Sequence, residues 1–401
     1  MKTNLIIYLT LAAAMAASAF RPANAAGVHA TALRIVESNL GIRSQEAALE
    51  ADLLDRKADN TLPPLEVEYS PFFRSGATGL ASSELVVSQG FDFPTRYAMQ
   101  SDVTNKMRDR SAASMASLRR DLYVEASQLG ISLVYARRKM EVLERRLSDA
   151  DSVVALTRRL IDHKAATALD LNRAILARGD AERELIEAGL EYSDAESSLR
   201  RLACGADLDL ENLEYDSEVD DIALPASGGE FAAESPAVAT AQREVEVAAA
   251  ERRVAASSWL PSFSIGYRRN TELQESADGF LVGISLPLYS IGKKGKGARA
   301  REAAASLAAD DARLQKEFEA EGALRNLATL RRAMAACDVA TAEESIRLCA
   351  EALRLGSITL TEYFSQTESL YSRLLDRLRL EHDYRRLAAS ISEYNFTIDS
   401  P

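Results

Sequence analysis

The residues best able to do covalent or metal chemistry are few and scattered along the chain. They are Cys204, Cys337, Cys349, His29, His163 and His382. Cys337 and Cys349 fall in one predicted helix, where a rise of about 1.5 Å per residue puts them roughly 18 Å apart, too far for a disulfide. The sequence shows no Cys/His spacing of a metal site, no nucleophile–base pair and no Gly-rich phosphate loop. We therefore expect no metal site, no cofactor and no enzyme activity.

The composition favours extended helices over a large globular core. The chain has 401 residues, of which 47% are hydrophobic, 27% are charged and only 6% are aromatic. Ala, Leu, Arg and Glu, which are strong helix formers, are abundant. The formal net charge of −12 argues against nucleic acid as a partner.

The first 25 residues have the pattern of a cleaved export signal. Lys2 gives a positive start, an apolar run extends from Leu5 to Phe20, and Ala23-Asn24-Ala25 matches an A-x-A cleavage site. An uncleaved membrane helix is the alternative, but the run is short for a span of about 20 residues. We assign 1–25 as a signal peptide, and no later segment offers about 18 unbroken apolar residues.

A strand-like stretch, FLVGISLPLY at 280–289, interrupts the helical pattern. Phe280, Val282 and Ile284 alternate with their neighbours at the period of two that is typical of a β-strand. A second alternating run precedes it at 260–268, and a polar loop lies between the two runs. Together they predict a β-hairpin at 260–289.

The same arrangement occurs twice, which predicts an internal duplication. "LPPLEVEYS" at Leu62 parallels "LPSFSIGYR" at Leu260, and "TALDLNRA" at Thr167 parallels "TLTEYFSQ" at Thr359. The first repeat, 26–203, is expected to hold helices at 30–58, 96–162 and 168–203 around a hairpin at 62–93, with strands 62–71 and 83–93. The second repeat, 235–396, is expected to hold helices at 235–258, 293–355 and 358–395 around strands 260–268 and 279–289. An acidic connector, 204–234, separates the repeats, and a tail, 397–401, follows them.

The strands have the length and alternation of a barrel wall in lipid. Each is about 9–11 residues long, enough to cross a bilayer when tilted. The predicted lipid-facing residues are Leu65, Val67, Tyr69, Val87, Phe91, Phe263, Ile265, Tyr267, Val282, Ile284 and Leu286. Four strands cannot close a barrel, because the smallest membrane barrels have about eight and an open edge leaves backbone groups unsatisfied. Several copies are therefore expected to share one barrel.

A water-soluble four-stranded sheet packed on a helical domain is the alternative for these strands. The helices argue against it, since a helix of about 65 residues would be about 100 Å long, far larger than a compact domain. In each repeat, the two shorter helices together nearly match the long one. Antiparallel rods of this kind would form the wall of a tube.

The duplicated unit resembles the TolC family of outer-membrane efflux channels. "SSWLPSFSIGYR" and "DGFLVGISLPLYSIGKKG" in the second hairpin are similar to the family's Trp-Leu-Pro and Ser-Leu-Pro-Leu pattern. "VSQGFDFPTRYA" at Val87 resembles an element of the heavy-metal-exporter branch, which is CzcC/CusC-like. "LRLGSITLTEYFSQ" resembles the family's turn at the periplasmic tip. The resemblance covers about residues 30–396.

The resemblance implies a fold and a set of partners. The fold class is mainly α with one β-hairpin per repeat, in which three copies build a long α-helical barrel and a twelve-stranded transmembrane β-barrel. The implied location is the outer membrane of a Gram-negative bacterium, with a helical tunnel in the periplasm. The implied partners are outer-membrane lipid, a periplasmic adaptor (membrane fusion protein) and an inner-membrane pump of RND or ABC type. The implied function is passive exit of substrate, and the CzcC/CusC-like element favours metal cations as that substrate.

The resemblance also implies site residues at the periplasmic tip. Asp170 and Glu362 match the acidic positions that face the pore, where carboxylates would favour cations or gate the channel. Caps of their own helices are the alternative role. The tip turns fall at Lys164-Ala165 and Gly356-Ser357. Lys164 replaces the usual Gly, and Ile358 replaces the gating Arg of the family's best-known member, which argues against a salt-bridge lock.

Two other classes of protein remain open at this point. A periplasmic adaptor would have one helical hairpin flanked by split β halves, whereas here a strand pair lies between helices twice. A soluble helical scaffold of the envelope would not span the membrane.

Overall fold

The computed structural model describes residues 27–73, 80–272, 275–286 and 293–391. Its elements, in chain order, are α2 (Val28–Ser38), α3 (Leu40–Asp59), β1 (Glu66–Phe73), β2 (Leu80–Asp92), α4 (Pro94–Asp162), α5 (Ala168–Leu202), α6 (Gly228–Glu234), α7 (Pro236–Ala256), β3 (Ser262–Glu272), β4 (Glu275–Ser285), α8 (Lys293–Ala335), α9 (Val339–Arg354) and α10 (Leu360–Ile391). Short 3-10 turns occupy Val219–Asp221 and Ser257–Trp259. This order confirms a mainly helical fold with two antiparallel hairpins. The predicted signal peptide and C-terminal tail lie outside the described residues.

Two predicted helices are each broken in the structure. The helix expected at 30–58 divides at Asn39, whose side chain accepts a hydrogen bond from the Ile42 amide and caps α3. The helix expected at 293–355 divides after α8, and Asp338 caps α9 by accepting from the Thr341 amide at 3.0 Å. Side-chain oxygens of Asn and Asp favour such starts because they satisfy free amide groups. The prediction of single helices was wrong at both points.

The strands are shifted from their predicted positions. The segment predicted as a polar loop at 268–279 belongs largely to β3 and β4, which pair from Ser262–Ser285 to Glu272–Glu275. Charged residues such as Arg268 and Asp278 are therefore part of the ladder. Residues 287–289 of the predicted strand lie outside the described residues.

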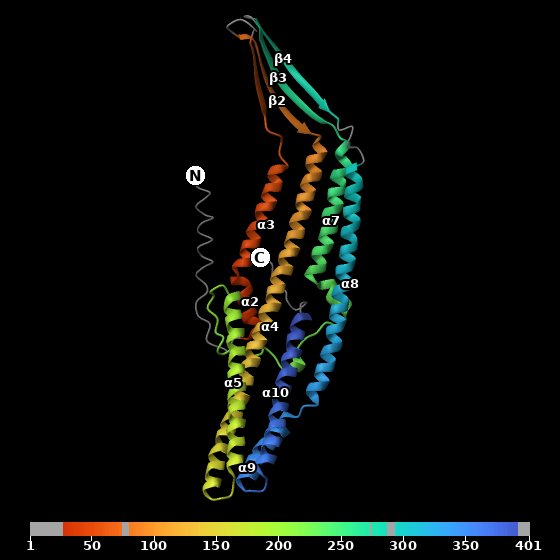
Figure 1. The fold of residues 1–401 in the computed structure, drawn as a ribbon. Coiled ribbons are helices and arrows are strands. Elements are labelled where there is room, and N and C mark those ends of the chain that lie inside the picture. Colours follow the sequence, from red (N-terminus) through yellow and green to blue (C-terminus); the bar gives the residue numbers. More distant parts are fainter. Residues whose placement is uncertain (1–26, 74–79, 273–274, 287–292, 392–401) are drawn as a thin grey trace, which may run out of the picture. The chain divides into compact units, whose positions relative to one another are not determined.

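The described chain divides into two compact units. One unit comprises Ser38–Glu125, Ile222–Cys337 and the described residues from Asp383 onward. It contains the sheet, α3, α6, α7, α8 and the first part of α4 (Figure 1). The other comprises the described residues up to Glu37, Ala126–Asp221 and Asp338–His382.

In the unit with the sheet, α7 and α8 run side by side (Figure 1). The short helix α6 packs on both of them. The first residue of α6 is Gly228, and a Cβ there would lie 2.4 Å from the Glu317 carbonyl oxygen of α8. Only glycine permits this close approach. Phe231 on the same short helix is 1% exposed and anchors it.

The segment predicted as a connector is packed rather than loose. Leu208, Leu210 and Leu213 are buried within it. The Arg137 guanidinium of α4 donates to the Leu213 carbonyl at 2.7 Å and contacts the Glu214 carboxylate at 2.6 Å. The final part of the segment forms α6, a short helix that the prediction missed. Across the described helices, none offers an apolar stretch long enough to cross a bilayer.

Candidate functional site

The four strands form one antiparallel sheet in the order β1-β2-β3-β4. Its register places Val67 opposite Val87, Val87 opposite Tyr267, and Tyr267 opposite Phe280. Residues paired directly across an antiparallel ladder point to the same face, and so do residues two apart along a strand. All the predicted lipid-facing residues within the strands therefore share one face, which we call the apolar face.

Side chains of the apolar face are unusually open to solvent for their type. Phe280 is 91% exposed and Val282 is 78% exposed. The predicted members that are exposed are Leu65, Val67, Tyr69, Ile265, Val282, Ile284 and Leu286, while Val87, Phe91, Phe263 and Tyr267 are half-buried. Leu65 and Leu286 lie just outside the ends of β1 and β4. Neighbouring rings stack within the face, with the centroids of Phe91 and Phe263 5.7 Å apart.

The opposite face of the sheet is largely polar, although Phe72, Val86 and Leu281 also lie on it. Glu84 and Arg268 form an ion pair across β2 and β3. Glu66, Ser88 and Gly266 follow one another across the next rung. A sheet with one exposed apolar face and one polar face suits a wall between lipid and water.

The sheet has two open edges. Within the described sheet, β1 pairs only with β2 and β4 pairs only with β3. The outer edges of both strands thus present backbone N–H and C=O groups with no partner strand. In hydrocarbon, each unsatisfied group costs several kcal/mol.

The two tip turns have the same backbone design. Lys164 and Gly356 both adopt positive φ, at 59° and 69°. The next amide donates five residues back in each turn, from Ala165 to the Leu160 carbonyl at 2.7 Å and from Ser357 to the Ala352 carbonyl at 2.8 Å. This is the Schellman ending of a helix, in which a left-handed residue satisfies free carbonyls.

Asp170 and Glu362 are capping residues in the structure. The Asp170 carboxylate accepts from the Thr167 amide at 2.9 Å and the Thr167 hydroxyl at 2.7 Å, and the Asp170 amide donates back to that hydroxyl. Glu362 makes the same contacts with Thr359. These hydrogen bonds lower the pKa of Asp170, with the Thr167 hydroxyl as the largest cause, and that of Glu362, with the Thr359 amide as the largest. Both groups stay ionised at neutral pH.

The two tip turns meet over a small apolar cluster. Arg173 on the second turn of α5 donates to the Thr361 hydroxyl on the first turn of α10 at 2.9 Å. Beneath them, Tyr363 and Leu353 are buried with Ala174, and Ile358 packs against this group. Ile358 is thus a packing residue at the position where the resemblance implied a gating Arg.

Sequence reasoning missed a buried polar link close to this cluster. Tyr371 of α10 is 4% exposed, and its hydroxyl donates to the Asp149 carboxylate of α4 at 2.6 Å. Burial, with the hydrogen bond to Asp149 as the second cause, raises the pKa of Tyr371. The two residues are 222 positions apart, so no local signal could have found the pair.

The cysteines and histidines do not come together. Cys204, Cys337 and Cys349 are free thiols, and the Cys349 thiol donates to the Gln366 side chain at 3.1 Å. His382 lies 3.1 Å from the Ser132 hydroxyl and against the Tyr135 ring. No group of three or more metal-ligating side chains occurs among the residues described.

In comparisons with known proteins, no family model and no curated protein matches the chain. Solved structures do match. The CmeC outer membrane channel of Campylobacter jejuni aligns with a TM-score of 0.77 at 13% identity, covering 93% of this chain and 87% of that one. The open MtrE outer membrane channel of Neisseria gonorrhoeae gives 0.75 at 18% identity, with 91% and 88% covered. CusC gives 0.72 at 16% identity, with 93% and 94% covered.

The chain has the fold of these outer-membrane channels. The likeness extends over both predicted repeats, since it covers more than nine-tenths of the chain in each comparison. It confirms the TolC-type fold that the sequence motifs predicted.

Proposed function

We propose that this chain is an outer-membrane exit channel, through which substrate leaves passively. The observation that carries the proposal is the apolar face of the sheet, where Phe280 and Val282 stand almost fully exposed. A water-soluble protein would cover a contiguous apolar patch of this kind, whereas lipid stabilises it. The fold shared with solved outer-membrane channels supports the same reading.

Closure of the sheet requires more than one copy. One chain supplies four strands with two open edges, and three chains would supply twelve. We propose a trimer in which β1 of one copy pairs with β4 of the next. The helical units would then surround a tunnel in the periplasm, and the tip turns would form its inner end.

The proposal also covers the docking partners of the channel and the substrate that it carries. A periplasmic adaptor and an inner-membrane pump would dock at the tip turns, and the pump would supply the energy. Asp170 and Glu362 would line the mouth, where ionised carboxylates favour cations. Metal cations are the proposed cargo, supported by the "VSQGFDFPTRYA" element and by the cation-favouring mouth.

The test compares two substitutions on neighbouring residues of β4. Val282 lies on the apolar face and Leu281 on the polar face, opposite Gly266. Val282→Arg should destabilise the inserted barrel by about 2–4 kcal/mol if it lies near the membrane midplane, whereas Leu281→Arg should be tolerated. The measurement is the amount of protein in the outer-membrane fraction of a Gram-negative host, followed by single-channel conductance in planar bilayers.

Two outcomes would contradict the proposal. Equal loss of both variants would mean that neither face meets lipid, as expected of a periplasmic adaptor or a soluble helical scaffold. Recovery of the unmodified protein from the soluble fraction without detergent would lead to the same conclusion.

A further inference from the structure

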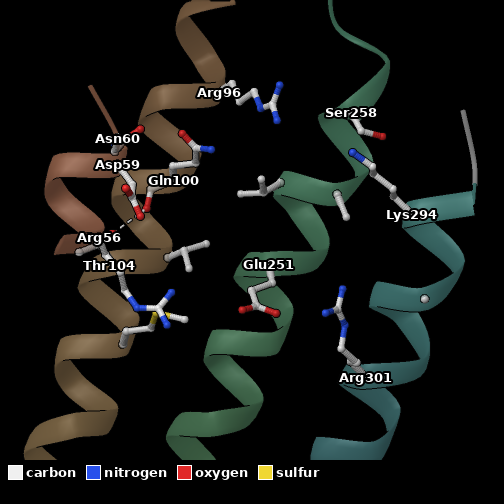
Figure 2. A pocket seen from close by; sticks show the side chains of 15 residues that line it. Arg56, Asp59, Asn60, Arg96, Gln100, Thr104, Glu251, Ser258, Lys294 and Arg301 are labelled. Carbon is white, nitrogen blue, oxygen red and sulfur yellow. Dashed lines mark hydrogen bonds between the residues drawn. The ribbon is translucent and has the colours of Figure 1, made fainter. Parts of the chain in front are cut away.

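A pocket of about 540 Å³ lies between four helices of the unit that contains the sheet (Figure 2). It is lined by the end of α3, the start of α4, the end of α7 and the start of α8, all in the same unit. Arg96 lies four residues after β2, and Ser258 is next to Trp259, which is 59% exposed and precedes β3. The pocket therefore lies close to the end of the sheet at which β2 ends and β3 begins.

Four charged side chains that line the pocket have no ion-pair partner among the described residues. Farther along the same helices, α4 and α7 are joined by matched ion pairs, such as Lys106 with Glu246 at 2.7 Å and Arg110 with Glu244 at 3.0 Å. In the pocket, Lys294 and Arg301 project from α8, while Asp59 ends α3 and Glu251 projects from α7 (Figure 2). Within the part of the chain that the structure describes, none of these four forms an ion pair.

Two buried polar atoms in the pocket also lack partners among the described residues. Arg96 Nε is a buried donor with no acceptor, although another nitrogen of the same guanidinium contacts Asp92 at 3.2 Å. Asn60 Oδ1 is a buried acceptor with no donor, and its orientation is fixed because the Asn60 amide nitrogen donates to the Tyr97 carbonyl at 3.0 Å. Unsatisfied buried groups of this kind are rare and point to a missing partner.

These features define the ligand by its chemistry. Lys294, Arg301 and Arg96 Nε would bind an anion with acceptor oxygens, such as a phosphodiester. Asp59, Glu251 and Asn60 Oδ1 would bind a cation that also donates hydrogen bonds. A primary ammonium meets that need, whereas a quaternary ammonium has no N–H to donate. A ligand with both ends would match the pocket.

We propose that this pocket binds a phosphoethanolamine headgroup, and that the source is a phosphatidylethanolamine lipid. The assignment of a lipid as the source of this headgroup rests on the proposed function, because a bound lipid requires the apolar face to lie in a membrane. Free phosphoethanolamine offers the same two charges, so the experiment includes it as a separate arm.

The experiment measures binding of four soluble probes to the detergent-solubilised full chain by native mass spectrometry. The probes are dihexanoyl phosphatidylethanolamine, the corresponding phosphatidylglycerol and phosphatidylcholine, and free phosphoethanolamine. The ethanolamine lipid should bind most tightly. Lys294→Gln with Arg301→Gln should weaken it about tenfold, as expected for the loss of two partly exposed ion pairs.

A second pair of variants tests the ammonium end. Asp59→Asn with Glu251→Gln should weaken the ethanolamine lipid by about tenfold while leaving the glycerol lipid unchanged, so that the preference between the two disappears. The matched control is Lys296→Gln with Arg299→Gln, which removes two exposed cations from the same helix but not from the pocket lining. It should leave binding of all four probes unchanged.

Specific outcomes would overturn the inference. Equal affinity for the three lipids, or equal loss in the control and the pocket variants, would show general charge attraction without a site. If free phosphoethanolamine bound as tightly as its lipid, the lipid source would be wrong. Conductance of each variant in planar bilayers is measured in parallel, so failure of the pocket is distinguishable from failure of the channel.

Discussion

At the residue scale, the link between Tyr371 and Asp149 is the clearest source of local stability. The Tyr371 hydroxyl donates to the Asp149 carboxylate at 2.6 Å, and the Tyr371 side chain is 4% exposed. We expect Tyr371→Phe to lower the free energy of unfolding by about 1.5–3 kcal/mol, the range for a hydrogen bond to a charged group. The measurement is urea unfolding of the detergent-solubilised protein, followed by far-ultraviolet circular dichroism.

Tyr363→Phe is the matched control for that prediction. Tyr363 is 3% exposed, and its hydroxyl has no hydrogen-bond partner among the described residues. Burial raises the pKa of Tyr363 to about 12, above the ordinary value of about 10. The native state therefore keeps a proton that the unfolded chain loses, and stability falls as pH rises from about 10 to about 12. Tyr363→Phe should reduce this alkaline loss with little change at pH 7, and an equal cost of both variants at pH 7 would contradict the role given to Asp149.

Asp170 and Glu362 carry a prediction about conduction. If both line the mouth of the channel, Asp170→Asn with Glu362→Gln should reduce the preference for cations in planar bilayers. Unchanged selectivity would leave both residues as helix caps alone. Because their folded pKa values are lowered, the stabilisation from the caps is complete above the ordinary carboxyl pKa of about 4 and is lost as pH falls through the folded values. Selectivity is therefore best measured at neutral pH, where the caps are intact.

At the element scale, the duplicated tip turns provide an internal comparison. The same left-handed position is held by Lys164 in one turn and by Gly356 in the other. A side chain in this conformation costs about 1–2 kcal/mol, partly offset because glycine loses more entropy on folding. Lys164→Gly should therefore stabilise the protein by up to about 1 kcal/mol, and Gly356→Ala should destabilise it by about 1 kcal/mol.

The two turns can be tested together by thermal unfolding. A Cβ on Gly356 would meet no heavy atom within 4 Å, so any cost of Gly356→Ala reports backbone strain rather than a clash. Effects of the same sign in both turns would refute the shared design.

The two N-cap breaks, at Asn39 and Asp338, show that a single capping side chain can interrupt helices that composition alone would join.

At the scale of the whole molecule, the open edges of the sheet decide the assembly. Four strands with one exposed apolar face cannot satisfy their outer backbone groups in lipid. We expect native mass spectrometry in detergent to give three times the mass of the mature chain, and semi-denaturing gels to show an oligomer that dissociates on heating. A monodisperse monomer would rule out the shared barrel, and a dimer or tetramer would set a different strand number.

The sequence by itself determined the fold class of this protein and its apolar face. Periodicity is a local property, so the alternation of Val67, Val87 and Val282 and the duplicated motifs could be read from neighbouring residues alone. Helix length in α4 and α5 followed for the same reason. The capping role of Asp170 was also readable as an alternative, because Thr167 is only three residues away.

Only the tertiary structure decided what distant segments do together. The link between Tyr371 and Asp149 joins residues far apart in the chain, and so does the pocket that Asp59, Glu251 and Lys294 line. The tertiary structure also decided the register of the strands. The charged ends of β3 and β4 have the residue types of a loop, and their backbone hydrogen bonds to each other make them strand. Contacts of this kind depend on how the chain returns to itself, which no local pattern of residue types encodes.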